Sequence, residues 1–238
     1  MKEMMTVCVK ELKSYFVSPI AYIFIIVYLT LTNFLFFQTF FINNQAEMRS
    51  YFELLPYIFL IFVPAITMRS WAEEKKNKTF ELLLTLPIRD TAVVAGKFLA
   101  ALAFLKITLL FSLTVPLTVA VLGNPDIGVI IGSYFGAVLL GAAYISIGMW
   151  VSSLTENQIV ALIGGVVVIL LLLLVGHPLI TYFAPSEFVN ILTYIGLAGH
   201  FESICRGVID SRDVVYYCSV IFFFLFLNVQ SLESRKWE

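Results

Sequence analysis

The chain has 238 residues, of which 60% are hydrophobic and only 13% are charged, and its mean hydropathy is +0.94. A soluble domain averages roughly 45–50% apolar and about 25% charged residues, so the composition excludes a soluble globular protein. The formal net charge of −1 gives no indication of nucleic-acid binding, and we expect none.

Six stretches predict membrane spans. Runs without charge cover residues 14–46, 54–68, 107–125, 127–155, 157–186 and 214–232. A membrane-spanning helix needs about 20 mostly apolar residues, and the short second run reaches that length with its aromatic flanks, which suit the interface. We therefore predict an all-α, polytopic integral membrane protein. Its six transmembrane helices are expected near 18–42, 51–71, 98–122, 128–152, 158–182 and 213–232.

Residues 1–17 are predicted to form an amphipathic helix in the plane of the interface. At about 100° per residue, the apolar side chains share one side, Glu11 lies on the polar side, and Val7 is misplaced. Such a helix is either a simple anchor or an elbow that also contacts a cytoplasmic partner. Because lysine and glutamate alternate ahead of the first span, we expect no cleavable signal peptide.

Individual residues mark the second, third and fourth spans. Pro56 and Pro64 should kink or break the second span. Lys106 is a charge deep within the third span, where it either snorkels or pairs within the bundle, or lines a substrate route. Glycines at every fourth position from Gly128 to Gly136 predict close approach of another helix, within this subunit or at a subunit interface.

The polar loop at 72–90 contains the segment AEEKKNKTFELLLTLP. Asn77 is a suitable N-cap, Glu81 lies in the first turn where the helix dipole favours an anion, and Pro87 ends the pattern. The predicted helix, near 78–86, is marginal alone in water. We expect it to rest on the membrane surface or, as its charged approach favours, to dock on a protein partner.

Residues 183–212, between the last two spans, are interrupted by Pro185, Gly196 and Gly207. They predict short interfacial or re-entrant helices on the outer side, covered by protein. The chain shows no repeat, linker or low-complexity segment, so we expect 1–238 to form a single domain.

The basic residues predict the orientation of the chain. With both termini inside, the outer loops contain only Arg49, Arg206 and Arg212. The cytoplasmic segments then contain Lys2, Lys10, Lys13, Arg69, Lys75, Lys76, Lys78, Arg89, Lys97, Arg235 and Lys236. The positive-inside rule therefore predicts cytoplasmic N and C termini.

Catalytic signals are weak. The Gly96-Lys97 pair has Thr91 where the first glycine of a phosphate-binding loop should stand. His177 and His200 lack clustered carboxylates or thiols, so we expect structural roles for both. We predict no catalytic site, metal or cofactor in this chain.

The 72–90 loop resembles that of the ABC-2 type permeases of ATP-binding-cassette transporters, which reads roughly E-[RK]…T-x-E-L-L…P…G-K. The matching residues are Glu74, Thr79, Glu81, Leu82, Leu83, Pro87, Gly96 and Lys97. Three further stretches agree, namely SSLTENQIVA (152–161), HFESICRGVIDSRDVVYY (200–217) and ESRKW (233–237). Together they look most like the gliding-motility and nitrous-oxide-reductase-maturation branch. Lys75 stands where arginine is common, which would weaken an ion pair.

The resemblance implies a permease subunit that pairs with a second copy or a related permease in a bacterial-type inner membrane. ATP and Mg would be bound by separate ATPase subunits, which dock on the elbow and on a coupling helix in the loop. The residues carried over to that docking site are Glu73, Glu74, Thr79, Phe80, Glu81 and Leu82. Glu156 and Asn157, between spans four and five, would form a second contact.

The sequence is compatible with three functions. The first is an exporter subunit that couples ATP hydrolysis to alternating access. The second is a non-transporting, ATPase-coupled anchor that transmits force or a signal to a transmembrane machine. The third is an autonomous channel or secondary carrier, which is disfavoured because no selectivity-filter-like segment is present. The cargo cannot be read from the residues.

Overall fold

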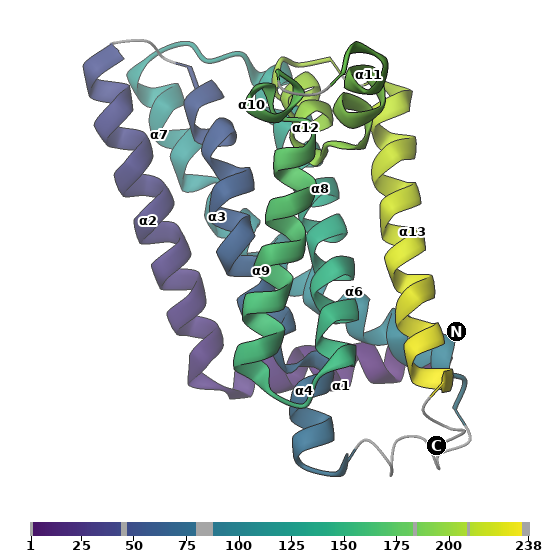
Figure 1. The fold of residues 1–238 in the computed structure, drawn as a ribbon. Coiled ribbons are helices and arrows are strands. Elements are labelled where there is room, and N and C mark those ends of the chain that lie inside the picture. The colour runs from purple at the N-terminus through teal and green to yellow at the C-terminus, as the bar shows by residue number, and fades with distance from the viewer. Residues whose placement is uncertain (1, 44–46, 80–87, 183–184, 209, 235–238) are drawn as a thin grey trace.

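The computed structural model describes residues 2–43, 47–79, 88–182, 185–208 and 210–234, and all regular structure among them is helical. Six helical segments of the described chain are long and apolar enough to cross a membrane: Pro19–Ile42, Arg49–Lys76, Asp90–Leu122, Ile127–Leu154, Gln158–Val175 and Ser211–Ser234. The predicted all-α architecture with six spans is confirmed. Figure 1 shows these segments side by side, with α1 lying across one end of the bundle and short helices gathered at the other.

The first two helices form an elbow. The N-terminal helix α1 (Lys2–Val17) ends immediately before α2 (Pro19–Asn43), which is the first span. Pro19 stands at the first helical position, where its missing N–H has no intrahelical acceptor in any case. The chain therefore changes direction at Ser18, and α1 lies transverse to the spans (Figure 1).

The second span consists of α3 (Arg49–Thr67) and α4 (Arg69–Lys76). The helix α3 continues through both Pro56 and Pro64, so neither proline breaks it. The interruption lies four residues after the second proline, at Met68, whose N–H still donates to the carbonyl oxygen of Pro64 at 2.8 Å. The predicted break therefore occurs at the junction with α4 and not within the apolar segment.

The third span begins earlier than predicted. It consists of α6 (Asp90–Phe111) and α7 (Thr114–Leu122), whereas the sequence suggested a start near residue 98. Lys97 consequently lies inside a helix instead of before it. Lys106 is exposed on the surface of the bundle, in a position that suits a snorkelling side chain.

The helix α8 (Ile127–Leu154) is the centre of the bundle, and every residue from 140 to 149 is buried. Asp126 caps its first turn, because a side-chain oxygen accepts from the N–H groups of Gly128 and Val129. The helix packs against α3, α6, α9 (Gln158–Val175), α12 (Leu197–Cys205) and α13 (Ser211–Ser234). Most elements of the fold are therefore positioned by this one helix.

The predicted close approach of another helix is found at Gly136. A Cβ atom there would lie 2.8 Å from Cγ2 of Ile204 in α12, so the glycine allows α12 to pack directly on α8. The contact lies within the subunit, which was one of the two alternatives for this glycine stripe.

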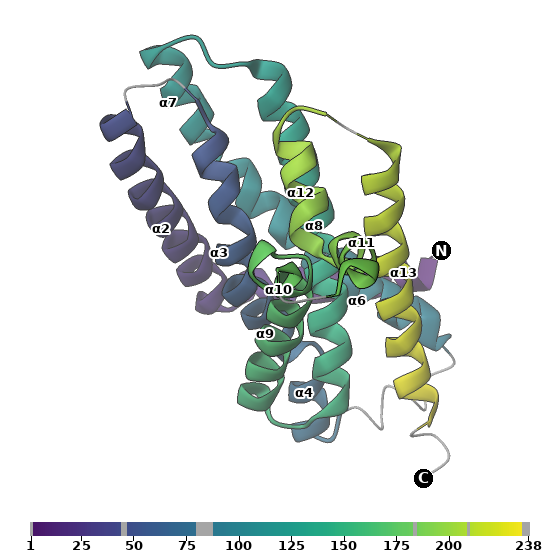
Figure 2. The ribbon, with the colours of Figure 1, turned by 45° about the horizontal axis from the view of Figure 1, so that its top comes forward.

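Short helices cover the end opposite α1, as predicted. They are α10 (Pro178–Thr181), α11 (Ser186–Ile195) and α12, which gather between α9 and α13 in Figure 2. The fifth span ends at Val175 and not near 182. Gly176, the C-cap of α9, packs against the backbone of Gly196, where a Cβ atom on Gly176 would lie only 2.9 Å from the facing Cα.

Candidate functional site

The site is built where α1 packs along α6. Gly96 allows this approach, because a Cβ atom there would lie 2.8 Å from Cβ of Val7 and 2.9 Å from the carbonyl oxygen of Met4. Val7, which the two-sided helical pattern misplaced, therefore faces α6. The glycine of the Gly96-Lys97 pair thus has a packing role that explains its position in the sequence.

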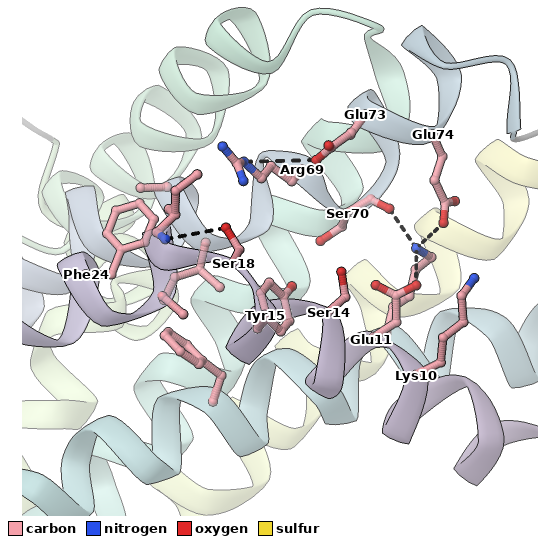
Figure 3. A pocket seen from close by; sticks show the side chains of 16 residues that line it. Lys10, Glu11, Ser14, Tyr15, Ser18, Phe24, Arg69, Ser70, Glu73 and Glu74 are labelled. Carbon is pink, nitrogen blue, oxygen red and sulfur yellow. Dashed lines mark hydrogen bonds and ion pairs between the residues drawn. The ribbon is translucent and has the colours of Figure 1, made fainter.

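The next residue, Lys97, joins three helices. Its side chain is 4% exposed, and Nζ lies 2.7 Å from Oε1 of Glu74 and 3.1 Å from Oε1 of Glu11. Nζ also donates to the carbonyl oxygen of Ser70 at 2.9 Å and lies 4.9 Å from the ring centroid of Trp71. Figure 3 shows the contacts from Glu11, Ser70 and Glu74 converging on this one amine. We call these five residues the Lys97 junction.

The ammonium group of Lys97 is satisfied electrostatically and by hydrogen bonds. Burial of an ammonium group is costly unless charges and acceptors replace its hydration, and two carboxylates, a carbonyl oxygen and an aromatic face do so here. Glu11 comes from α1, whereas Ser70, Trp71 and Glu74 come from α4. Glu11, which the sequence pattern placed on the polar side of α1, forms an ion pair inside the protein.

Ser152 connects α4 to the end of α8. Its Oγ accepts from the N–H groups of Trp71 and Ala72, each at 3.2 Å, and donates to the carbonyl oxygen of Met68 at 3.0 Å. These backbone groups belong to the interrupted turn between α3 and α4. A side chain inserted in a helix ladder is an established cause of a kink, so Ser152 both stabilises the kink and attaches it to α8.

Lys75 makes a second connection on the same side of α4. It is buried, and its Nζ donates to the carbonyl oxygen of Ser153. The hydroxyl of Ser153 in turn lies 3.1 Å from that of Ser231 in α13. Lys75, the departure from the family pattern, therefore helps to hold α4 against α8 and α13.

The described part of the predicted docking loop continues from α4. Glu73 is partly buried, with Oε2 4.0 Å from Nε of Arg69. Glu74 points into the Lys97 junction, and Thr79 is exposed with its hydroxyl donating to the Glu74 carbonyl oxygen at 3.2 Å. Asn77, predicted to cap the loop helix, is instead the C-cap residue of α4.

Three of the predicted docking residues, Phe80, Glu81 and Leu82, lie outside the described residues, as does most of the predicted helix near 78–86. Just before these residues, Lys78 has a φ of 57°, which is in the left-handed region. This conformation redirects the backbone at the end of α4.

The second predicted contact, Glu156 and Asn157, forms the exposed turn between α8 and α9. Asn157 is the N-cap of α9, and its Oδ1 accepts from the N–H of Ile159 at 2.9 Å. Since α4 contacts both α8 and α9, this turn lies at the same end of the bundle as α4. The predicted docking residues Glu73 and Glu74, which are in α4, therefore lie at the same end of the bundle as this turn.

Sequence reasoning did not assign roles to Glu11, Lys97 or Ser152. Two of them had a usable signal, because Lys97 ends the loop motif and Ser152 opens the SSLTENQIVA stretch. Glu11 had none, since a glutamate among lysines on an amphipathic helix is normally solvated.

The opposite end contains a partly buried polar cluster around His200. His200 Nδ1 lies 2.7 Å from Oδ1 of Asp213, and Nε2 lies 2.8 Å from the carbonyl oxygen of Tyr194. The imidazole ring stacks on Tyr216 with centroids 4.0 Å apart. The expected structural role of His200 fits these contacts, which tie α11 and α12 to α13. Within the described residues, no group of three or more His, Cys, Asp or Glu side chains could hold a metal ion.

Comparison with known proteins identifies the family. The family model described as "ABC-2 family transporter protein" matches residues 5–195 of this chain. The chain is also 29% identical over 173 residues to the "Probable multidrug ABC transporter permease YbhR" of Escherichia coli (strain K12), and equally to the protein of that name in Escherichia coli O157:H7. These alignments cover 69% of this chain and 45% of each relative, so the chain spans about half the length of the curated relatives it matches. The chain belongs to the ABC-2 family of transporter proteins.

Proposed function

We propose that this chain is the transmembrane permease subunit of an ATP-binding-cassette transporter in a bacterial-type inner membrane. In this proposal both termini are cytoplasmic, and the chain works with a second copy or a related permease. Separate ATPase subunits would hold ATP and Mg. Family membership supports the proposal, as does the concentration of basic residues at the end that carries α1 and α4.

The observation that carries the proposal is the Lys97 junction. An ATPase that pushes on α4 and residues 80–87 would act on an element attached to α1 and α6 through Lys97 and to α8 through Ser152. Because packed helices move as rigid bodies, displacement of α4 would pass to three other helices at once. Such an arrangement would suit the conversion of ATPase closure into a rearrangement of the spans.

We propose that transport is outward. The basis is the resemblance of the loop, together with the similarity to relatives named as probable multidrug ABC transporter permeases. The branch suggested by that resemblance, gliding motility and nitrous-oxide-reductase maturation, stays a prediction.

Co-purification tests the docking assignment. Phe80→Asp with Glu81→Arg should abolish association with the ATPase subunits and stimulation of ATP hydrolysis in membranes. The matched control is Phe188→Asp with Glu187→Arg, which makes the same changes in exposed residues of α11 at the opposite end. If both double variants retain the ATPase equally, the loop is not the docking site.

A non-transporting anchor would use the same docking surface, so co-purification does not separate it from a transporter. Transport assays in reconstituted vesicles distinguish the anchor from the transporter. A transporter moves cargo across the membrane only with hydrolysable nucleotide, whereas an anchor hydrolyses ATP without cargo movement.

A further inference from the structure

A cavity of about 340 Å³ lies between α1, the start of α2, the end of α3, α4 and α6. Small-molecule sites typically have volumes of about 300–1,000 Å³, so the cavity can hold a ligand. We call it the elbow cavity because it occupies the corner where α1 meets α2. It lies at the level of α1, which is the level expected for the head groups of one leaflet.

The walls of the elbow cavity are amphipathic. Its apolar residues come mainly from α2 and α3 and include Ile20, Ala21, Phe24, Ala65 and Ile66. Its polar residues come mainly from α1 and α4 and include Lys10, Glu11, Ser14, Arg69, Ser70, Glu73 and Glu74. In Figure 3, Phe24 lies at one end of the cavity, and Lys10 and Glu74 lie at the other. A molecule with an apolar part and a polar part matches this division.

Two polar atoms of opposite character lack hydrogen-bond partners among the described residues. They are Nε of Arg69, a donor, and Oε2 of Glu74, an acceptor, and both are shielded from solvent. The nearest anion to Arg69 is Glu73, with Oε2 4.0 Å away, which is too far for a hydrogen bond. The other oxygen of Glu74 is already bound to Lys97 at 2.7 Å. Several buried side-chain atoms of the described residues have no hydrogen-bond partner, and these two are the ones whose residues line the elbow cavity, where Arg69 supplies a cationic group and Glu74 an anionic group.

We propose that the elbow cavity binds the zwitterionic head group of an aminophospholipid. The phosphate ester accepts from Arg69, and the primary ammonium group donates to Glu74. The acyl chains leave past the apolar wall and lie along the exposed apolar face of α2, where Tyr22, Ile23 and Ile26 are each more than half exposed. The bound lipid contacts α1 and α4 together, beside the Lys97 junction.

The head-group chemistry makes the site selective. Phosphatidylcholine has a quaternary ammonium group and so has no N–H to donate to Glu74, whereas phosphatidylglycerol has no cation. Phosphatidylethanolamine has both a phosphate ester that accepts from Arg69 and a primary ammonium group that donates to Glu74. We therefore expect phosphatidylethanolamine to bind roughly tenfold tighter than either of the others, the factor expected for a hydrogen bond to a charged group.

Native mass spectrometry of the delipidated permease, titrated with each lipid in detergent and without ATPase, tests the site. Arg69→Gln should weaken phosphatidylethanolamine binding roughly tenfold or more by removing the charged donor. Ala65→Trp should weaken it similarly by filling the cavity while keeping every charge. The control, Arg49→Gln, changes an exposed arginine paired with Glu53 at the other end of the bundle and should bind as the parent does.

Equal binding of phosphatidylethanolamine by the parent, Arg69→Gln and Ala65→Trp would overturn the proposal, as would equal binding of the three lipids. Water-soluble glycerophosphoethanolamine provides the last arm of the test. Competition by this compound only at concentrations at least roughly a hundredfold higher supports a lipid, since the acyl chains contribute to binding. Competition at the lipid's own concentration would contradict a lipid source. None of these results depends on ATPase docking, so this proposal and the proposed function can fail separately.

Discussion

At Lys97, one ammonium group faces two carboxylates, a carbonyl oxygen and an indole ring, all supplied by helices other than its own. The partners lie 86 residues before it, for Glu11, and 23 residues before it, for Glu74. One side chain thereby fixes the relative positions of α1, α4 and α6. We expect loss of this side chain to weaken the packing of all three helices.

Lys97→Met should lower the free energy of unfolding by about 3–5 kcal/mol, because Glu11 and Glu74, each only 20% exposed, would be left without a cation. Thermal unfolding of the purified protein in detergent measures the change. Lys13→Met, at an exposed position of α1, is the control and should have little effect.

A triple variant tests whether the loss of stability in Lys97→Met comes from the unpaired carboxylates or from lost packing of the lysine side chain. Adding Glu11→Gln and Glu74→Gln to Lys97→Met removes the unpaired charges, so much of the lost stability should return. If the triple variant is no more stable than Lys97→Met, the charges are not what the junction depends on.

Gly96→Ala provides a second test at the residue scale. Alanine is favoured over glycine by about 1 kcal/mol inside a helix, yet the new Cβ would meet Val7 and the Met4 carbonyl oxygen at under 3.0 Å. We expect a net loss of stability of about 1–3 kcal/mol from overpacking. Adding Val7→Ala should restore part of it.

Gly199→Ala is the matched control for this substitution. Its nearest contact to a new Cβ is 3.9 Å, so the helical preference for alanine should dominate and stability should not fall. A Gly96→Ala protein as stable as Gly199→Ala would show that α1 does not approach α6 as closely as described.

At the scale of elements, the kink between α3 and α4 depends on a side chain from α8. Ser152→Ala should remove the hydroxyl that accepts from the N–H groups of Trp71 and Ala72, at a cost of about 1–3 kcal/mol. Hydrogen exchange should become faster in α4. Ser146→Ala is the control, because that hydroxyl donates only to the carbonyl oxygen of Ala143 in its own helix; equal exchange in the two variants would contradict the role of Ser152.

The elements themselves were largely predictable, because a bilayer requires long apolar helices whose number can be read from runs without charge. The orientation of α1 was less predictable. A two-sided pattern assumes one apolar and one polar face, whereas α1 has a protein-facing side with Val7 and Glu11 and a separate exposed apolar side with Met5 and Val9. Only the partner helix distinguishes these faces.

At the scale of the whole molecule, the sequence predicted which segments contact the ATPase, and the contacts between helices at that end were not predicted. The turn at Glu156 and Asn157 was predicted to form a second contact with the ATPase, and it lies at the same end of the bundle as Glu73 and Glu74 in α4. The Lys97 junction was not predicted, because its contacts join helices far apart in the chain. The elbow cavity was not predictable either, since it exists only where α1, α2, α3, α4 and α6 meet.

The central claim is that the end carrying α1, α4 and the 72–90 loop faces the cytosol and binds an ATPase. Labelling of Thr79→Cys with a membrane-impermeant thiol reagent tests it most directly, in a protein whose cysteines at 8, 205 and 218 are replaced. In inverted membrane vesicles, we predict rapid labelling at this exposed position and protection by added ATPase subunits, while Glu187→Cys at the opposite end stays unlabelled. Labelling of Glu187→Cys in place of Thr79→Cys, or labelling of Thr79→Cys that the ATPase leaves unchanged, would contradict the account.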